Sequence, residues 1–373
     1  MHALLALLVL PWLTGVAQST DWSRGLDAEA AGFSGVVLIG RGDAIEVVAG
    51  YGFADPAKTR RNTRDTRFNL GSINKTFTAV AIAQLVQQGR LALDDTLARH
   101  VPDYPNQAAA ARITIRDLLT HRSGVAQFMR ADFGDVSVAA MVQAVGAQPQ
   151  AFEPGARQEY SNGGYVVLGR VIEVTSGQPY SAYVSDHIYR PAGMTASGFF
   201  RPGDLENSVA LPVTAAGSVG GSRGAGPGPT VASGGPRTGN PAGGGYTTAV
   251  DLFRFARALR TGRLLDPRMT QYVLHGTFAE QPRWGFSLRE QVIGGRRFIG
   301  NGGGAPGVNA EFRFEPSGDA TVVVLANSSP PAATELLSVI LNRIAGVSPA
   351  PVAQAQAQAQ ATWPSCGAMA PAN

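Results

Sequence analysis

The segment GFSGVVLIGRGDAIEVVAGYG, residues 32–52, decides the fold of this 373-residue chain. It contains two apolar runs, Val36 to Ile39 and Ile45 to Ala49, separated by Gly40 to Asp43. Two such runs joined by glycine and aspartate are typical of a β-hairpin. The Arg-Gly-Asp sequence in the turn is explained by the turn itself and is not interpreted as an adhesion motif.

Strand patterns return near the other end of the chain. Residues 296–329 contain the turn sequence PSGD and then TVVVLAN, a run typical of a fully buried strand. Apolar residues at helical spacing predict helices in the following segments: one after Ser72 that stops at Gly89, then Ile115 to Leu119, Val136 to Val145, Gly164 to Thr175, Ala249 to Leu259 and Glu335 to Ile344. The helix after Ser72 is expected to have one apolar face, formed by Phe77, Val80, Ala81 and Leu85.

This order of elements predicts an α+β fold. Strands at both ends with helices between them indicate an antiparallel sheet built from the two chain ends, flanked by helices and carrying a helical insertion. A chain of 373 residues that is 44% hydrophobic can bury the core that such a fold needs. Only 16% of its residues are charged, the net charge is +4, and no run of five basic residues occurs, which argues against nucleic acid as a partner.

The N-terminal sequence MHALLALLVLPWLTGVAQST is typical of a secretory signal peptide. We expect it to comprise residues 1–17, with cleavage after Ala17, and to direct the protein to the periplasm or outside the cell. A retained membrane anchor is the alternative, but the apolar run falls short of the ~20 residues that span a bilayer, so no stable anchor is expected. With Cys366 as its single cysteine, the chain cannot form an intrachain disulfide.

The rest of the chain is interpreted as one domain over residues 18–346 and a disordered tail over 347–373. The tail contains AQAQAQAQ and lacks apolar periodicity. Within the domain, residues 215–245 are rich in glycine, proline and serine and are expected to form a long mobile loop.

The chemistry is indicated first by NLGSINKTFTAV, residues 69–80. Lys58 and Lys75 are the only lysines among the 31 lysines and arginines of the chain. Ser72 and Lys75, three residues apart at the start of a helix, share one face, and the serine hydroxyl lies near the positive end of the helix dipole. A neutral lysine amine can accept the serine proton, whereas arginine stays protonated. The pattern favours a nucleophile with its base, although a bare Ser-x-x-Lys also occurs by chance.

Two further patterns carry candidate site residues. Tyr160 and Asn162 form a Tyr-x-Asn at the start of a helix, where a phenol can move a proton and an amide can orient a lysine or a substrate carbonyl. An aromatic staple with an asparagine cap is the structural alternative. Asn301 precedes Gly302, Gly303 and Gly304 at the end of a strand, and glycines there let a substrate lie against the strand edge. The alternative is a loose glycine loop.

Together with LLTHRSGV (118–125), HIYRPAGM (187–194) and PAGGGYTTAVDLFRFARAL (241–259), these three patterns in this order resemble the serine β-lactamase and penicillin-recognising family. The likeness is to its class C branch, which includes D-alanyl-D-alanine carboxypeptidases, D-aminopeptidases and esterases, and it covers roughly residues 28 to 345. It implies a β-lactamase/transpeptidase-like fold and a serine hydrolase domain.

By this resemblance Ser72 is the acylated nucleophile, Lys75 its proton acceptor, and Tyr160 the residue that passes the proton to the leaving group. Asn162 would contact the substrate, and the N–H groups of Ser72 and Gly304 would form the oxyanion hole. The resemblance implies no cofactor. No metal site is expected either, because His100, His121, His187 and His275 show no metal-ligand spacing, and His121 is interpreted as a packed or hydrogen-bonded structural residue.

The chain departs from the family at Asn301, where lysine or histidine is usual and helps to bind a substrate carboxylate. We therefore expect an exported hydrolase of a small ester or amide. A β-lactamase or D-Ala-D-Ala carboxypeptidase, acting on a D-amino-acid peptide or a β-lactam, is the alternative within the same chemistry. A non-catalytic ligand-binding or sensor protein is the alternative of another class. The sequence does not fix the oligomeric state.

Overall fold

The central element of the fold is a six-stranded antiparallel sheet. The computed structural model describes residues 21–127, 136–200, 204, 208–214, 230–232, 238–275 and 286–348. The strand order is β2-β1-β10-β9-β8-β7. The strands are β1 (Gly35–Arg41), β2 (Ala44–Tyr51), β7 (Arg289–Ile293), β8 (Arg296–Ala305), β9 (Val308–Phe314) and β10 (Thr321–Ala326).

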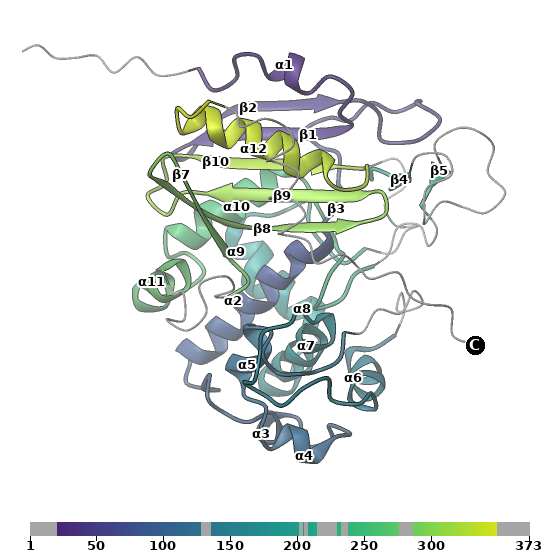
Figure 1. Ribbon diagram of the computed structural model, residues 1–373, viewed down its shortest axis with the longest axis vertical. Coiled ribbons are helices and arrows are strands. Elements are labelled where there is room, and N and C mark those ends of the chain that lie inside the picture. Colours follow the sequence, from purple (N-terminus) through teal and green to yellow (C-terminus); the bar gives the residue numbers. More distant parts are fainter. Residues whose placement is uncertain are drawn as a thin grey trace, which may run out of the picture.

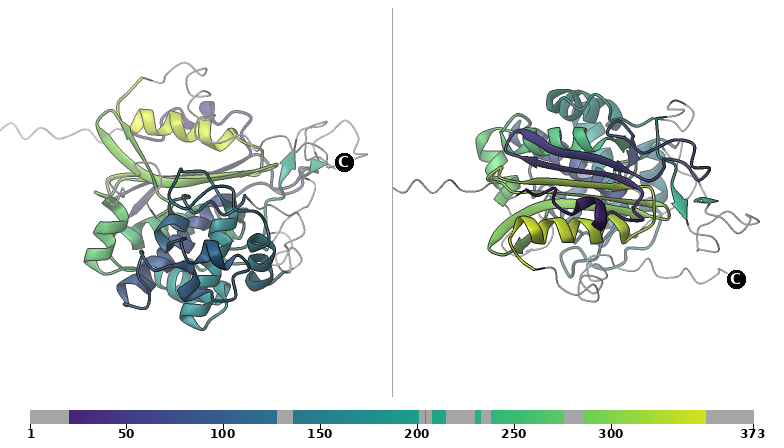
Figure 2. Two further views of the ribbon diagram at one scale, coloured as in Figure 1. Left: turned by 60° about the horizontal axis from the view of Figure 1, so that its bottom comes forward. Right: turned by 90° about the horizontal axis from the view of Figure 1, so that it is seen from above.

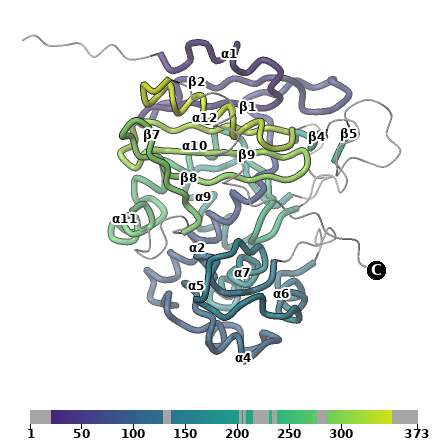
Figure 3. The backbone as a smooth tube through the Cα atoms, viewed as in Figure 1, coloured from purple at the N-terminus to yellow at the C-terminus, as the bar shows by residue number. Residues whose placement is uncertain are grey.

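The two ends of the domain meet at the centre of this sheet. β1 pairs with β10, with Val37 opposite Val324, so the hairpin β1–β2 and the C-terminal strands form one sheet. In Figure 3 the purple hairpin lies beside the green strands of the C-terminal part. The prediction of an antiparallel sheet built from both chain ends is therefore confirmed (Figure 1).

Helices cover both faces of the sheet. α1 (Leu26–Glu29) and α12 (Ala332–Ile344) lie on one face, and a larger helical group lies on the other, as the right-hand view of Figure 2 shows. That group consists of α2 (Asn74–Gln87), α3 (Leu97–His100), α4 (Gln107–Ala110), α5 (Ile115–Leu119), α6 (Val138–Gly146), α7 (Asn162–Ser176), α8 (Tyr180–Val184), α9 (Arg190–Ala192), α10 (Ala249–Arg260) and α11 (Pro267–His275). Short strands form two further pairs, β3 (Phe68–Asn69) with β6 (Tyr246–Thr247), and β4 (Val213–Thr214) with β5 (Thr230–Val231).

The layered arrangement explains why the central strands read as continuous apolar runs. Alternate residues of a strand point to opposite faces. In β1, Val36 and Leu38 join the core beneath the larger helical group, whereas Val37 and Ile39 join the core beneath α12. Because both faces are covered, neither set is polar.

Helix α2 is buried on all sides and not only on the predicted face of Phe77, Val80, Ala81 and Leu85. Each of its residues from Asn74 to Leu85 is buried. Buried polar groups need hydrogen-bond partners, and Asn74 Nδ2, Lys75 Nζ and Thr78 Oγ1 have them. The helix ends at Gln87, and Gly89 has a φ of 68°, in agreement with its predicted role as a stop. The fold thus carries polar side chains into its centre, where the candidate site lies.

Other predicted helices are found close to their expected bounds. α5 matches Ile115 to Leu119, and α7, α10 and α12 contain the predicted segments. α6 begins at Val138 rather than Val136 because the Ser137 side chain accepts a hydrogen bond from the backbone N–H of Ala140 and caps the helix.

The predicted loop over residues 215–245 differs from the expectation where it is described. Residues 230–231 form β5, and Asn240 pairs with Gly243 in a turn in which Ala242 is buried. Residues 215–229 and 233–237 lie outside the described residues, as do the predicted signal peptide, the chain beyond residue 348 and Cys366. In the described part of the chain, no helix is both long and apolar enough to cross a membrane.

Candidate active site

Ser72 lies in η1 (Gly71–Ile73), a short 3-10 turn that leads directly into α2. The backbone around it is held by the turn after Asn240, because Gly244 N donates to Gly71 O at 3.0 Å and Leu70 N donates to Gly245 O at 3.0 Å. Gly71 has a φ of 50°, a conformation that favours glycine. The residue before the serine is thus fixed by both backbone conformation and hydrogen bonds.

Two side chains, Lys75 from α2 and Tyr160 from just before α7, converge on the Ser72 hydroxyl. Ser72 Oγ lies 2.7 Å from Tyr160 Oη and 3.3 Å from Lys75 Nζ. Lys75 Nζ also donates to Asn162 Oδ1 at 2.6 Å. The structure therefore brings together the four residues that the sequence singled out at 72, 75, 160 and 162.

The surroundings of Lys75 suit a base. Its side chain is 1% exposed, and burial, followed by the positive charge of Arg289, holds its pKa well below the ordinary value. Besides Ser72, Nζ contacts Asn162 Oδ1 and the carbonyl oxygen of Ala242, two groups that only accept hydrogen bonds. A neutral amine has two N–H groups and one lone pair. Both N–H groups are used by these acceptors, so the lone pair is left for the Ser72 hydroxyl.

Tyr160 is packed against the Lys75 amine and the His121 ring. Lys75 Nζ lies 4.8 Å from the centre of its ring, and the His121 ring lies 4.7 Å away. His121 Nδ1 accepts from Ser161 N at 3.1 Å, which leaves the ring proton on Nε2. Burial, then the charges of Lys75 and Arg289, lower the pKa of His121 well below its ordinary value, so the ring is neutral. His121 is a packed, hydrogen-bonded residue as expected, but its contact with Tyr160 was not predicted.

The start of α7 decides between two interpretations of the Tyr-x-Asn pattern. The helix is capped by Ser161, whose Oγ accepts from Gly164 N at 2.9 Å. Asn162 is therefore not the cap, and its side-chain oxygen is available to Lys75. The structural alternative of an asparagine cap is wrong because Ser161 caps the helix.

The glycines of β8 lie directly against the nucleophile. A Cβ on Gly303 would overlap Leu70 O and lie 2.7 Å from Ser72 N, and a Cβ on Gly71 would lie 2.9 Å from Gly304 N. Only a strand without side chains can approach the Ser72 backbone this closely. The segment is thus an ordered strand rather than a loose loop, and its position suits the expected oxyanion hole at the N–H groups of Ser72 and Gly304.

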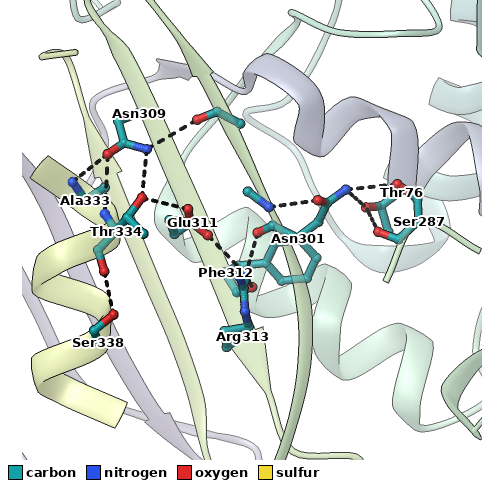
Figure 4. A network of polar contacts seen from close by, with 12 residues as sticks. Thr76, Ser287, Asn301, Asn309, Glu311, Phe312, Arg313, Ala333, Thr334 and Ser338 are labelled. Atoms are coloured by element: carbon teal, nitrogen blue, oxygen red, sulfur yellow. Dashed lines mark hydrogen bonds and ion pairs between the residues drawn. The ribbon is translucent and has the colours of Figure 1, made fainter. Parts of the chain in front are cut away.

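The side chain of Asn301 is buried between β8 and α2. Its side chain is 1% exposed, and its Nδ2 donates to Thr76 Oγ1 at 3.1 Å and to Ser287 Oγ at 2.9 Å. Its Oδ1 accepts from Gly302 N at 2.9 Å (Figure 4). The bond to Thr76 links β8 to α2, and together these bonds satisfy the buried amide of Asn301.

A second polar group supports β8 from the α12 side. Arg313 Nη1 donates to Asn301 O at 2.9 Å and lies 3.1 Å from Glu311, whose Oε1 accepts from Thr334 Oγ1 at 2.9 Å (Figure 4). A Cβ on Gly302 would lie 2.5 Å from the Glu311 carboxylate. Gly302 therefore makes room for a buried ion pair behind the strand.

Arg289 is a residue that sequence reasoning missed. It opens β7 opposite Gly300, next to Asn301, and β7 pairs with β8 no further than this point. Burial, then Arg313, lowers the pKa of Arg289 to about 10, and its charge lowers the pKa values of Lys75 and His121. In the sequence, Arg289 is only an arginine at the start of a strand. Its place opposite Gly300 depends on the pairing of β7 with β8, which residue spacing does not predict. Among the residues described, no three His, Cys, Asp or Glu side chains are grouped so as to hold a metal ion.

Comparisons with known proteins identify the family of this chain. Residues 23–343 match the family model described as Beta-lactamase. The chain is 31% identical over 298 residues to the putative penicillin-binding protein PbpX of Bacillus subtilis (strain 168), an alignment that covers 79% of this chain and 71% of that protein. Among solved structures, it is similar to a penicillin binding protein from Bacillus halodurans (TM-score 0.71, 29% identity, 85% of this chain and 99% of that one). It is also similar to the D-amino acid amidase from Ochrobactrum anthropi SV3 (TM-score 0.73, 25% identity, 87% and 98%). The chain belongs to the Beta-lactamase family.

Proposed function

We propose that this protein is an exported serine hydrolase that cleaves a small ester or amide through an acyl-enzyme on Ser72. The observation that carries the proposal is the convergence of Lys75 Nζ and Tyr160 Oη on Ser72 Oγ, at 3.3 Å and 2.7 Å. A serine is activated as a nucleophile when an adjacent base accepts its proton. The likeness to a D-amino acid amidase supports the inclusion of amides.

In the proposed reaction one proton moves between Ser72, Lys75, Tyr160 and the leaving group. Lys75 accepts the Ser72 proton as Oγ attacks the substrate carbonyl, and the N–H groups of Ser72 and Gly304 stabilise the oxyanion. The proton passes from Lys75 through Tyr160 to the leaving group as the bond to that group breaks. Water then attacks the carbonyl of the acyl-enzyme. Its proton passes through Tyr160 and Lys75 to Ser72 Oγ as the ester bond breaks, which releases the acid and restores the Ser72 hydroxyl.

Covalent labelling tests the proposal. We expect a fluorophosphonate to add one adduct to the purified protein, located by mass spectrometry on the peptide with Ser72, and nitrophenyl esters to be hydrolysed. The Ser72→Ala variant serves as the control and should show neither. If the wild-type protein showed no adduct and no turnover, and Ser72→Ala bound ligands equally well, the non-catalytic binding alternative would replace the enzyme.

Export is tested separately. N-terminal sequencing of protein recovered from outside the cytoplasm should begin at Gln18. A chain that begins at Met1 and stays in the membrane fraction would favour the retained anchor instead.

A second candidate, hydrolysis of a substrate that carries a carboxylate, is favoured by Arg289. This partly buried arginine lies opposite Gly300, where the outer edge of β8 ceases to pair with β7, and its charge acts on Lys75 and His121. A cation at this edge could serve the carboxylate of a D-amino-acid peptide or a β-lactam. A panel of neutral esters, D-amino-acid amides, D-Ala-D-Ala peptides and a chromogenic cephalosporin would rank the two candidates. If Arg289→Leu raised KM for the carboxylate-bearing compounds alone, the second candidate would be preferred.

A further inference from the structure

Helix α2 binds three successive backbone carbonyl groups of the segment Asn240–Ala242. Asn74 Nδ2 donates to Asn240 O at 2.6 Å, Thr78 Oγ1 donates to Pro241 O at 2.7 Å, and Lys75 Nζ donates to Ala242 O. Residues 74 and 78 are neighbours on a helix surface, and 75 lies beside them. The carbonyl that Lys75 contacts is therefore placed by the same helix that carries Lys75.

Tyr180 joins the two anchoring side chains. Its Oη lies 3.1 Å from Asn74 Nδ2 and 2.7 Å from Thr78 Oγ1. Because Thr78 gives its proton to the Pro241 carbonyl, the tyrosine hydroxyl donates to Thr78 and accepts from Asn74. One chain of donors thus runs from Asn74 through Tyr180 and Thr78 to the backbone of Pro241.

The segment is confined on its other side by α7. A Cβ on Gly169 would overlap the ring of Pro241. Asn240 Oδ1 also accepts from Ala242 N at 2.8 Å, which fixes the turn internally. The carbonyl of Ala242 therefore has one position, set by packing against α7 and by hydrogen bonds to α2.

We propose that Asn74, Thr78 and Tyr180 are positioning residues for the base, acting through the backbone of residues 240–242. The proposal rests on the function proposed above. Lys75 Nζ has two acceptors, Asn162 Oδ1 and Ala242 O, and the direction of its remaining lone pair depends on where both lie. If the segment moved, the amine would turn away from the Ser72 hydroxyl, and water could reach it.

The test compares Thr78→Val with Thr78→Ser. Valine keeps the shape of threonine and removes the donor to Pro241, whereas serine keeps the donor. We expect Thr78→Val to slow fluorophosphonate labelling and lower kcat about ten- to a hundred-fold, with KM changed less than about two-fold. Thr78→Ser should stay near the wild-type values. Tyr180→Phe, which removes only the hydroxyl between Asn74 and Thr78, should reproduce the loss and provides a second variant.

The pH dependence separates a positioning role from a structural one. Burial is the main cause of the lowered Lys75 pKa, so water admitted by a loosened segment should raise that pKa and move the acid limb of kcat/KM to higher pH. Thr78→Val and Tyr180→Phe variants that melt earlier but keep the wild-type kcat and pH profile would overturn the inference. A wild-type protein that is never labelled at Ser72 would instead overturn the proposed function, so the two failures are distinguishable.

Discussion

The phenol oxygen of Tyr160 lies 2.7 Å from the hydroxyl oxygen of Ser72, although 88 residues separate them in the chain. Ser72 enters from the turn before α2, and Tyr160 lies two residues before α7. The His121 ring packs at 4.7 Å on the phenol, so the position of Tyr160 is held from behind. A group so placed can carry a proton between Lys75 and a leaving group without large motion.

Removal of the Tyr160 hydroxyl tests this role. We expect Tyr160→Phe to lower kcat for ester hydrolysis about a hundred- to ten-thousand-fold, the usual contribution of general acid–base catalysis. The phenyl ring keeps the packing against His121, so the melting temperature should change little. Steady-state kinetics and thermal unfolding provide the two readouts. Unchanged kcat in Tyr160→Phe would assign the proton transfer to another group.

Lys75 should act only while its amine is neutral. Because its pKa is lowered, we expect kcat/KM to be lost as pH falls through that pKa, at a pH well below the ordinary value for lysine. Lys75→Arg keeps a positive charge but cannot be deprotonated, so activity should fall about a hundred-fold or more at every pH.

Arg289→Leu removes a positive charge that lowers the pKa of Lys75, so it should move the acid limb of the kcat/KM profile to higher pH. An acid limb that stayed in place would show that Arg289 does not act on the base.

Much of the fold followed from local patterns because both chain ends encode strands that are buried on two faces. The runs around Val37 and Val324 are apolar throughout, and such runs have few alternatives to a central strand. The polarity of α2 was harder to interpret. Lys75 and Thr78 look like surface residues in a sequence, and their burial depends on carbonyl groups more than 160 residues away.

The candidate site was predictable where chemistry requires a residue type, and less so where packing decides. Ser72, Lys75, Tyr160 and Asn162 were singled out by residue type and spacing, and the resemblance to the family assigned their roles. The partners of Asn301, Thr76 and Ser287, could not be predicted because they are brought together only by the folded chain. Arg289 was missed for the same reason, since the pairing of β7 with β8 places it opposite Gly300, where its charge acts on Lys75.

The buried position of Asn301 leads to a prediction about stability. Asn301→Leu removes donors to Thr76 and Ser287 and should lower the free energy of unfolding by about 1–3 kcal/mol, the cost of leaving buried polar groups unpaired. Urea unfolding measures this difference. Because the side chain is buried and its polar atoms are used by Thr76, Ser287 and Gly302, the relative KM values for neutral and carboxylate-bearing substrates should stay unchanged. A selective change in KM would return Asn301 to the substrate side.

The close approach of β8 to the nucleophile predicts a strong effect of one methyl group. In Gly303→Ala the new Cβ would overlap Leu70 O and lie 2.7 Å from Ser72 N, so the strand or the serine must shift. We expect labelling of Ser72 to fall about a hundred-fold, as displacements of reacting groups commonly cause. Gly164→Ala is the matched control, because its Cβ would lie no closer than 3.6 Å to another atom. Equal labelling rates in the two variants would contradict the proposed position of the oxyanion hole.

The neutral, buried ring of His121 predicts a dependence of stability on pH. Burial lowers its pKa in the folded protein, whereas the unfolded chain has the ordinary value of about 6.5. Below about pH 6.5 the unfolded state therefore binds more protons, and the free energy of unfolding should decrease by up to about 1.4 kcal/mol per pH unit. The loss continues until the lowered pKa of the folded state is reached.

His121→Asn isolates this contribution. Asparagine tolerates the φ of 59° at this position and does not titrate, so the variant should lose less stability than the wild type between about pH 7 and about pH 5. Urea unfolding at several pH values gives the comparison, and the other histidines are common to both proteins. The same variant lacks the ring that packs on Tyr160, so its kcat should fall even at neutral pH, where the titration has no effect. Parallel pH curves for the two proteins would mean that His121 takes up a proton as readily in the folded state as in the unfolded one.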